Sequence, residues 1–310
     1  MKKLTVIVII FVILALGTGI IAMGMEQPNQ ADMINDEQVP LSSGAHQSYK
    51  SLDMDMNDED ARILNTESGQ VQINSGLLSQ GAVAIRFDYN GENKIKISVE
   101  KDHDQIYYNY LDNGKYEIFP LQFGNGNYEI TLLENTTGKS YKVLERFDIR
   151  MEIEDENLVY LNSVQSVDWN YEDSSTKLAL QLTEGMKSES EKFMAIYDYI
   201  VNNIQYDYDK IEALEYSYLP DNDAIMDAGR GICYDYSSLM ASMLRSLGVP
   251  TKLVKGYGDF QPDVYHAWNE VLLDGKWYLV DTTYDAQLLS DGKKVEVIKD
   301  RNEYDVVYTY

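Results

Sequence analysis

The spacing of apolar and polar residues divides the chain into segments of different character. Between residues 66 and 155, apolar side chains alternate with polar ones at a period of two, which is typical of strands that bury one face. This alternation is carried by Val83, Ile85, Phe87 and Tyr89, by Ile95, Ile97 and Val99, by Tyr128, Ile130 and Leu132, and by Phe147, Ile149, Met151 and Ile153. We therefore expect a small all-β domain at 66–155, built as a sandwich.

Turn-forming residues separate these strand-like runs. They are Asn90-Gly91, Asn113-Gly114 and the cluster Gly124-Asn125-Gly126. Asparagine and glycine adopt positive φ more readily than other residues, and tight hairpin turns require such backbone angles. The sequence thus predicts turns of this kind at these positions. His103, in the same region, has no cysteine or second histidine near it, and we expect it at a plain surface or strand position.

After a connecting segment at 156–187, the apolar period becomes helical. Ser188 and Glu191 have the spacing of a capping box, in which the two side chains satisfy unpaired backbone N–H groups at a helix start. The apolar residues that follow at helical spacing are Phe193, Ile196, Ile200 and Ile204. This pattern predicts a helix over 189–204 and opens a C-terminal domain that we place at 188–310.

A second helix and several strands follow in this domain. The helix begins near Cys233 and ends at Gly248, just before Pro250. Strands are predicted at 251–257, 264–272 and 276–281, and Asp274-Gly275 forms a hairpin turn between the last two. Helices followed by strands with antiparallel links indicate an α+β domain.

The N-terminus suggests export. Lys2 and Lys3 precede an apolar run without charges that extends to residue 25, long enough to span a membrane. Residues 1–25 are thus a membrane anchor or a signal peptide, and the basic end favours a cytoplasmic N-terminus. Residues 26–65 are polar and acidic, typical of a flexible stalk. We expect a single-pass protein with its C-terminal part outside the cell, or a secreted protein if the segment is cleaved.

Composition narrows the partners. The net charge of −25 would repel nucleic-acid phosphates, so we expect no nucleic-acid partner. Cys233 is the single cysteine, so no disulfide can form within the chain. A zinc site needs three or four ligands, and the C-terminal half offers only this cysteine and one histidine, His266. We expect no metal and no cofactor.

Three residues of the C-terminal domain could perform chemistry together. Cys233 lies at a predicted helix start, where unpaired N–H groups favour a thiolate. His266 lies in the middle of a predicted strand, and Asp281 ends the strand paired with it. The carboxylate would then be close enough to orient the imidazole. Nucleophile, base and orienting acid are what acyl transfer requires. Taken singly, each residue is as easily explained by ordinary packing.

The local sequences around these residues resemble the transglutaminase-like superfamily. They are Gly231-Ile232-Cys233-Tyr234-Asp235-Tyr236-Ser237, then Tyr265-His266-Ala267-Trp268-Asn269-Glu270-Val271, then Gly275-Lys276-Trp277-Tyr278-Leu279-Val280-Asp281-Thr282-Thr283. The resemblance covers about 188–286 and omits the β domain and the stalk. It implies a papain-like core, with helices packed on an antiparallel sheet, and acyl transfer on an amide.

The resemblance also implies a role for each residue. Cys233 attacks the carbonyl, His266 carries the proton, and Asp281 holds the histidine tautomer, while the backbone N–H of Cys233 contributes to the oxyanion hole. Asp285 is a rival to Asp281 as the orienting carboxylate. Gln205 and Tyr206 are candidates for a second oxyanion donor. Trp268 and Trp277 are expected to pack the strands, and Tyr234 stands where the family often has a small or amide side chain.

Several functions remain open on the sequence alone. The first is a peptidase or amidase that hydrolyses a protein or peptide amide at the cell surface, possibly near the cell wall. The same acyl-enzyme could transfer to an amine, which would make the protein a cross-linking transglutaminase. The third is a binding or scaffold module that retains the fold without catalysis. Whether water or an amine resolves the intermediate depends on how the closed site excludes solvent, which sequence does not reveal.

Overall fold

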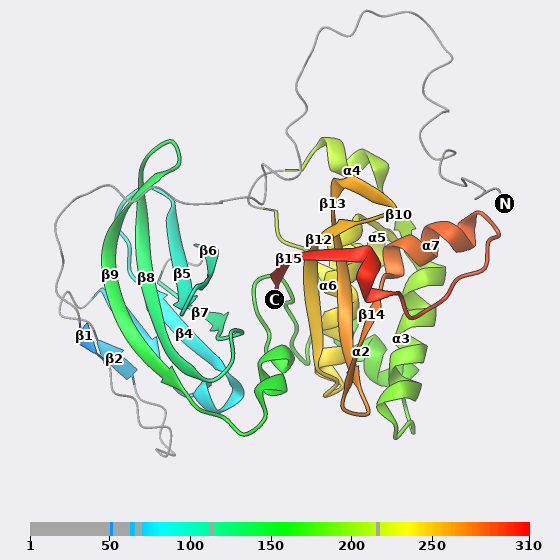
Figure 1. Ribbon diagram of the computed structural model, residues 1–310, viewed down its shortest axis with the longest axis horizontal. Helices are drawn as coiled ribbons and strands as arrows, with labels where there is room; N and C mark the ends of the chain where they lie inside the picture. The colour runs from blue at the N-terminus through cyan, green and yellow to red at the C-terminus, as the bar shows by residue number, and fades with distance from the viewer. Residues whose placement is uncertain (1–49, 52–62, 66–69, 112–113, 215–217) are drawn as a thin grey trace, which may run out of the picture.

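The computed structural model describes residues 50–51, 63–65, 70–111, 114–214 and 218–310. They form a strand-rich N-terminal part beside a C-terminal part of helices and strands (Figure 1). The expected anchor at 1–25 and most of the expected stalk lie outside the described residues. Within the described ranges, every helix is too short or too polar to cross a bilayer.

The N-terminal part is a sandwich of two sheets. One sheet has the strand order β1-β9-β8-β5-β6 and the other β2-β3-β4-β7. The strands of the first are β1 (Lys50–Ser51), β9 (Ser140–Met151), β8 (Gly126–Thr137), β5 (Ile95–Lys101) and β6 (Asp104–Tyr110). Those of the second are β2 (Ile63–Asn65), β3 (Val71–Asn74), β4 (Ala82–Phe87) and β7 (Tyr116–Pro120), with the 3-10 turn η1 (Leu78–Gln80) before β4.

The alternating apolar residues of the sequence form the core of this sandwich. Ile85, Ile97, Ile130 and Phe147 are almost completely buried in one cluster that joins the two sheets. Burying an aliphatic or phenyl side chain of this kind contributes about 1.5–3 kcal/mol. The predicted all-β, sandwich-like part is therefore confirmed, and the segment predicted as stalk contributes its two short strands, β1 and β2.

The hairpin turns predicted within the N-terminal part are wrong in kind, whereas the one predicted at Asp274-Gly275 is present. Asn90-Gly91 connects β4 to β5, and Gly114 and the Gly124–Gly126 cluster connect β6 to β7 and β7 to β8, and in every case the two strands belong to different sheets. Residue 113 lies outside the described residues. The tight turns are at Asp102-His103, where Asp102 has φ 57°, and at Gly138, with φ 56°. Turn residues mark a reversal of the chain. Only tertiary packing decides whether the next strand pairs with the previous one or joins the other sheet.

Residues 156–187 contain two short helical elements. The 3-10 segment η2 (Glu156–Leu161) follows the sandwich, and α2 (Ser174–Leu182) places Ala179 in the apolar core of the C-terminal part. This core also contains α3 (Glu189–Asn203), whose Ser188–Glu191 capping box is present as predicted. Such a cap stabilises a helix by about 1 kcal/mol.

The remaining helices and strands surround the cysteine helix. In chain order they are β10 (Gln205–Tyr206), α4 (Tyr208–Glu212), α5 (Asn222–Ala228), β11 (Arg230–Gly231), α6 (Cys233–Ser246), β12 (Thr251–Gly258), β13 (Gln261–Leu273), β14 (Lys276–Val280), α7 (Thr282–Ser290), η3 (Arg301–Glu303) and β15 (Tyr304–Thr309). The antiparallel sheet has the order β14-β13-β12-β15, and α6 packs against β12 and β13. This is the α+β class that the sequence predicts.

Two elements near the site were not predicted, α7 and β15. β15 completes the sheet by pairing with β12, although the two are far apart in sequence. Gly256 permits this approach, because a Cβ at that position would lie only 1.9 Å from the carbonyl oxygen of Asp305. In the register of the sheet, Gly256 lies opposite His266. The long-range pairing therefore brings the C-terminal residues to the histidine strand.

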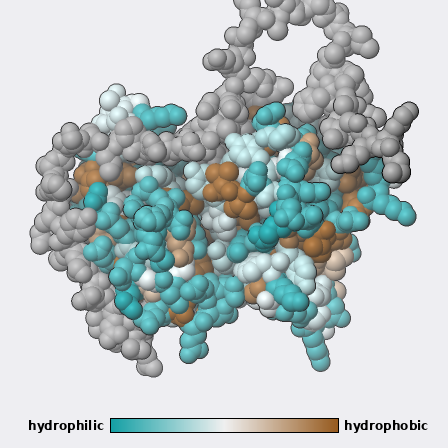
Figure 2. Space-filling view, in the orientation of Figure 1, coloured by the Kyte–Doolittle hydropathy of each residue, from teal (hydrophilic) through white to brown (hydrophobic). Residues whose placement is uncertain are grey.

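The two parts of the molecule share an apolar contact. The C-terminus lies between them (Figure 1), where the ring of Tyr310 meets that of Tyr108 with centroids 6.1 Å apart. The buried guanidinium of Arg245 donates to the carbonyl oxygens of Asn162 and Tyr310 at 2.7 and 2.8 Å. The visible surface of both parts is mainly hydrophilic (Figure 2), as the acidic composition leads one to expect.

Candidate active site

Cys233 is the first residue of α6 and is buried, with 7% of its surface exposed. Ile232, the residue before it, has no hydrogen-bond acceptor in its side chain, so a residue in the first turn of the helix provides the cap instead. The carboxylate of Asp235 accepts a hydrogen bond from the backbone N–H of Ile232 at 2.8 Å. Gly231 leaves room for this carboxylate, because a Cβ there would lie 2.6 Å from Cβ of Asp235. The sequence around the cysteine thus fixes the position of the sulfur.

Asp235 is fully buried and has further partners from the segment after α3. Lys210 Nζ lies 2.6 Å from Asp235 Oδ2, and the hydroxyl of Tyr218 donates to Oδ1. Lys210 Nζ also contacts the Tyr218 hydroxyl at 2.6 Å. Removing one member of such a buried group would leave an unpaired charge. Sequence reasoning missed this cluster, although an aspartate three residues after a helix start is a recognisable capping signal.

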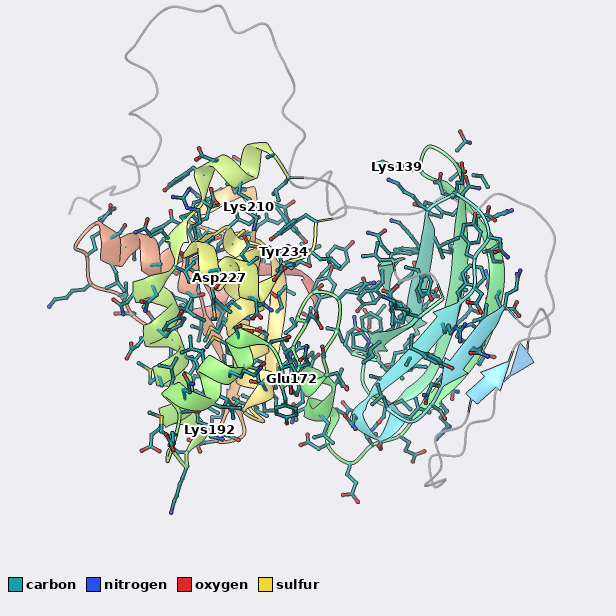
Figure 3. The ribbon with its side chains drawn as sticks, turned by 180° about the vertical axis from the view of Figure 1, so that it is seen from behind. Lys139, Glu172, Lys192, Lys210, Asp227 and Tyr234 are labelled. Atoms are coloured by element: carbon teal, nitrogen blue, oxygen red, sulfur yellow. The ribbon has the colours of Figure 1, made fainter. Side chains whose placement is uncertain are left out.

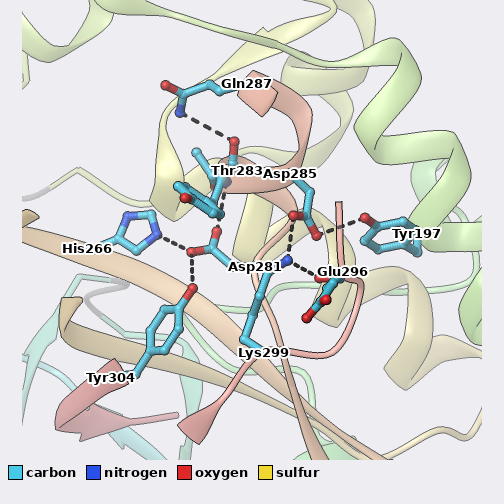
Figure 4. Close-up of polar contacts among 10 residues, drawn as sticks. Tyr197, His266, Asp281, Thr283, Asp285, Gln287, Glu296, Lys299 and Tyr304 are labelled. Carbon is cyan, nitrogen blue, oxygen red and sulfur yellow. Dashed lines mark hydrogen bonds and ion pairs between the residues drawn. The ribbon is translucent and has the colours of Figure 1, made fainter. Parts of the chain in front are cut away.

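His266 and Asp281 form a direct contact. Nε2 of His266 lies 2.7 Å from Oδ2 of Asp281, which has no exposed surface (Figure 4). The contact leaves Nδ1 as the ring nitrogen available to the thiol. Cys233 lies close enough to His266 for its thiol to contribute to the raised pKa of the histidine. The structure therefore brings together all three residues that the sequence nominated.

The charges of these groups support one another. Burial alone would lower the pKa of His266, but the charge and hydrogen bond of Asp281, with a smaller contribution from Cys233, raise it to about 10. Burial would likewise raise the pKa of Asp281, but His266 and the hydrogen bonds from Tyr284 N–H and the Tyr304 hydroxyl hold it below its usual value. At neutral pH the pair is an imidazolium and a carboxylate.

Asp281 is fixed by the fold from several directions. It is the N-cap of α7, and its Oδ1 accepts from the backbone N–H of Tyr284 at 2.9 Å. The hydroxyl of Tyr304, on β15, donates to Oδ2 at 3.1 Å. Tyr304 itself packs on Trp268, with ring centroids 5.0 Å apart. Sequence reasoning missed Tyr304, because β15 joins the sheet through long-range pairing that no local pattern announces.

Asp285, the rival orienting residue, has other partners. Its carboxylate contacts Lys299 Nζ at 2.5 Å and accepts from the Tyr197 hydroxyl at 2.8 Å (Figure 4). It lies one turn further along α7 and makes no contact with His266 among the described residues. The carboxylate that reaches the imidazole is that of Asp281.

The other residues named from the sequence occupy different environments. Trp268 is fully buried in a small apolar cluster, and Trp277 packs edge-on against Tyr160 with centroids 5.4 Å apart. Both therefore pack the fold. Gln205 is exposed. Tyr206 is half-buried and close enough to Cys233 for the two groups to interact electrostatically.

The described residues contain no cluster of three or more histidine, cysteine or acidic side chains that could hold a metal ion. A thiol at a helix start, an imidazole near it and a buried carboxylate behind the imidazole are the side chains that acyl transfer by a thiol requires.

Residues 176–282 match the transglutaminase-like superfamily. The kyphoscoliosis peptidase of Mus musculus is 30% identical over 122 residues, which are 36% of this chain and 18% of that protein. The uncharacterized protein YebA of Bacillus subtilis (strain 168) is 24% identical over 168 residues, 47% of this chain and 21% of that protein. The chain thus spans about a fifth of the length of these relatives.

A solved structure of a candidate cysteine protease from Cytophaga hutchinsonii is also similar. It has a TM-score of 0.39 and 22% identity, and the match covers 51% of this chain and 48% of that one. The match to the transglutaminase-like superfamily lies within the C-terminal part of the chain and rests on the sequence at 176–282.

Proposed function

We propose that the protein is a thiol enzyme that acts on amide bonds by acyl transfer through Cys233, His266 and Asp281. The proposed acceptor is water, so the reaction is hydrolysis. The observation that carries this proposal is the 2.7 Å contact between His266 and the buried Asp281, in a domain whose one cysteine interacts with the same histidine. A scaffold has no need of this arrangement, because apolar residues of similar volume can often replace a buried ion pair without loss of stability.

The proposed reaction has two steps. The Cys233 thiolate attacks the amide carbonyl, His266 gives its proton to the leaving amine, and a thioester forms as the C–N bond breaks. Water then attacks the thioester, returns a proton to His266, and releases the acid and the thiolate. Asp281 keeps the ring aligned and stabilises the imidazolium. The proposed oxyanion donor is the backbone N–H of Cys233, at the start of α6.

The substrate and the compartment are part of the same proposal. The kyphoscoliosis peptidase and the cysteine protease among the relatives are both named as proteases, so a protein or peptide amide is the proposed substrate. The basic residues and apolar run at 1–25 support an anchored or secreted protein that acts at the cell surface, in or near the cell wall. Cross-linking remains the alternative outcome, because an amine could replace water in the second step.

An activated ester tests the acyl-transfer chemistry without knowledge of the substrate. The purified full-length protein is mixed with 4-nitrophenyl acetate, and the expected result is a burst of one nitrophenolate per chain with an acetyl group on Cys233, found by mass spectrometry. Cys233→Ala should show neither. A wild-type chain without a burst would contradict the proposal and leave the scaffold as the explanation.

Hydrolysis and cross-linking are then separated with a protein acceptor. The protein is incubated with labelled casein and a fluorescent primary amine, and we expect peptide release without incorporation of the amine. Incorporation without cleavage would identify a cross-linking transglutaminase instead.

A further inference from the structure

A lysine is buried beside the proposed nucleophile. Lys255 lies on β12 and exposes 5% of its surface. Its Nζ lies 3.5 Å from the ring centroid of Tyr234, which directly follows Cys233, and 4.9 Å from that of Tyr310. Tyr234 is on the side of α6 toward the N-terminal sandwich (Figure 3), where its hydroxyl contacts Oγ of Ser166 at 3.1 Å. The sandwich therefore helps to close this environment.

The sheet register shows on which face of the sheet the same lysine lies. Lys255 pairs with Ala267 on β13, and the next residue along β12, Gly256, pairs with His266. Side chains of directly paired residues share a face of the sheet and alternate along a strand, so the Lys255 side chain lies on the face opposite to that of His266. This is the face covered by α6, where Asn269 Nδ2 donates to the carbonyl oxygen of Ser237, and Lys255 approaches Cys233 there beside the Tyr234 ring.

Lys255 has no acidic partner within the described ranges. The nearby Lys252, on the same strand, pairs with Glu270 at 3.1 Å and lies 4.1 Å from the Trp277 ring centroid. Lys255 has only aromatic faces and an electrostatic interaction with Cys233. A buried ammonium is unfavourable unless an opposite charge or aromatic ring compensates it.

The other titratable groups around Lys255 are tyrosines. They are Tyr234 on α6, Tyr257 on β12, Tyr265 on β13, and Tyr308 and Tyr310 on β15. Burial raises the pKa of Tyr234, Tyr265 and Tyr310, so these phenols remain neutral at physiological pH. Besides these tyrosines, Lys255 interacts electrostatically with Cys233.

We propose that Lys255 is a positioning residue whose buried ammonium holds Cys233 in its thiolate form, together with the start of α6 and His266. The inference deepens the proposed function, because it concerns the same nucleophile. Burial lowers the pKa of Lys255 to about 7, whereas Cys233 acts in the opposite sense. The ammonium is therefore charged, and its effect on the thiolate greatest, below about pH 7.

Alkylation of the thiol tests this proposal without any substrate. Because the chain has a single cysteine, the rate of reaction with iodoacetamide reports on Cys233 alone. Lys255→Met should slow the reaction at pH 6 by roughly tenfold and move the pH profile upward by about one unit. Lys255→Arg should restore most of the wild-type rate. The matched control, Lys252→Met on the same strand, should leave the profile unchanged.

Folding of each variant is checked by circular dichroism, and Lys255→Gln serves as a second neutral variant. A folded neutral variant with the wild-type profile would overturn the proposal. The wild-type protein offers an independent measurement, its relative rate with iodoacetate and iodoacetamide at pH 6. We expect a higher ratio than for a short cysteine peptide, despite the net charge of −25, because the local cations attract the carboxylate.

A wild-type ratio no higher than that of the peptide would also overturn the proposal. The two proposals fail separately. A protein in which Lys255→Met slows alkylation but which forms no acetyl-enzyme would refute the acyl-transfer function and leave the role of Lys255 intact.

Discussion

Two buried aspartates one turn apart on α7 form nearly matching clusters. Asp281 contacts a cation, His266, and a tyrosine hydroxyl, that of Tyr304. Asp285 also contacts a cation, Lys299, and a tyrosine hydroxyl, that of Tyr197. Neither carboxylate has exposed surface. Burial and ion pairing are therefore the same in both and do not explain why only one belongs to the candidate site.

The difference lies in the cation and in the helix start. His266 also interacts with Cys233. Lys299 Nζ, by contrast, contacts Asp285 on α7 and donates to the carbonyl oxygen of Glu296. Asp281 also caps the helix, and its pKa is below its usual value, whereas burial raises the pKa of Asp285 despite Lys299. A buried carboxylate acquires a catalytic role through what its partner reaches, not through its own burial.

The largest expected effect separates the two carboxylates by activity. Asp281→Asn should lower kcat with 4-nitrophenyl acetate by about 10²–10⁴-fold, because the imidazole loses the group that orients it and stabilises its charge. Asp285→Asn, the matched control, should change kcat by no more than a few fold. Equal losses of kcat in two folded variants would remove the distinction between the clusters.

The next effect separates them by stability. Asp285→Asn leaves the buried Lys299 ammonium without its carboxylate, and removing one partner of such a pair costs about 3–5 kcal/mol. We expect the lower end of that range, because the ionised Asp285 is itself unfavourably buried. Urea denaturation followed by circular dichroism measures the change. An unchanged unfolding midpoint would show that the second cluster is not structural.

The pH dependence gives a third contrast. The pKa of His266 in the folded protein is about 10, above its unfolded value of about 6.5, so its stabilisation is complete below pH 6.5 and is lost as the pH rises to 10. The pKa of Asp281 is lowered, so its stabilisation is lost as the pH falls below about 4. The difference in unfolding free energy between wild type and Asp281→Asn should thus be greatest between about pH 4 and about pH 6.5.

Urea titrations at a series of pH values measure this difference. NMR titration of the His266 ring provides a direct check, since its pKa should move from about 10 toward 6.5 in Asp281→Asn. A His266 pKa near 6.5 in the wild type would mean that the pair is not ionised at neutral pH.

The smallest expected effects concern the two tyrosines. Tyr304→Phe removes one hydrogen bond to Asp281, which is typically worth about 0.5–1.5 kcal/mol, and should lower kcat by up to roughly tenfold. Tyr197→Phe removes the matching bond to Asp285 and should affect stability by a similar amount while kcat stays unchanged. The comparison of kcat with the unfolding midpoint in both variants shows whether Tyr304 acts through Asp281.

Local patterns in the sequence determined much of this protein. Alternation at a period of two identified the strand-rich part, because one face of each strand is buried. The Ser188–Glu191 spacing identified the start of α3, since a capping box needs only neighbouring residues. Cys233, His266 and Asp281 could also be nominated, because the segments around them resemble those of one superfamily in the same order.

Only the tertiary structure decided the rest. The turn at Asn90-Gly91 connects two sheets, and β15 joins β12 across a large sequence distance, so neither could be inferred from neighbouring residues. Tyr304 reaches Asp281 through that pairing. The sequence favoured Asp281 over Asp285, and the structure shows that the Asp281 carboxylate is the one in contact with the imidazole. Contacts between distant segments are set by packing of the whole domain, and a single sequence encodes them without displaying them.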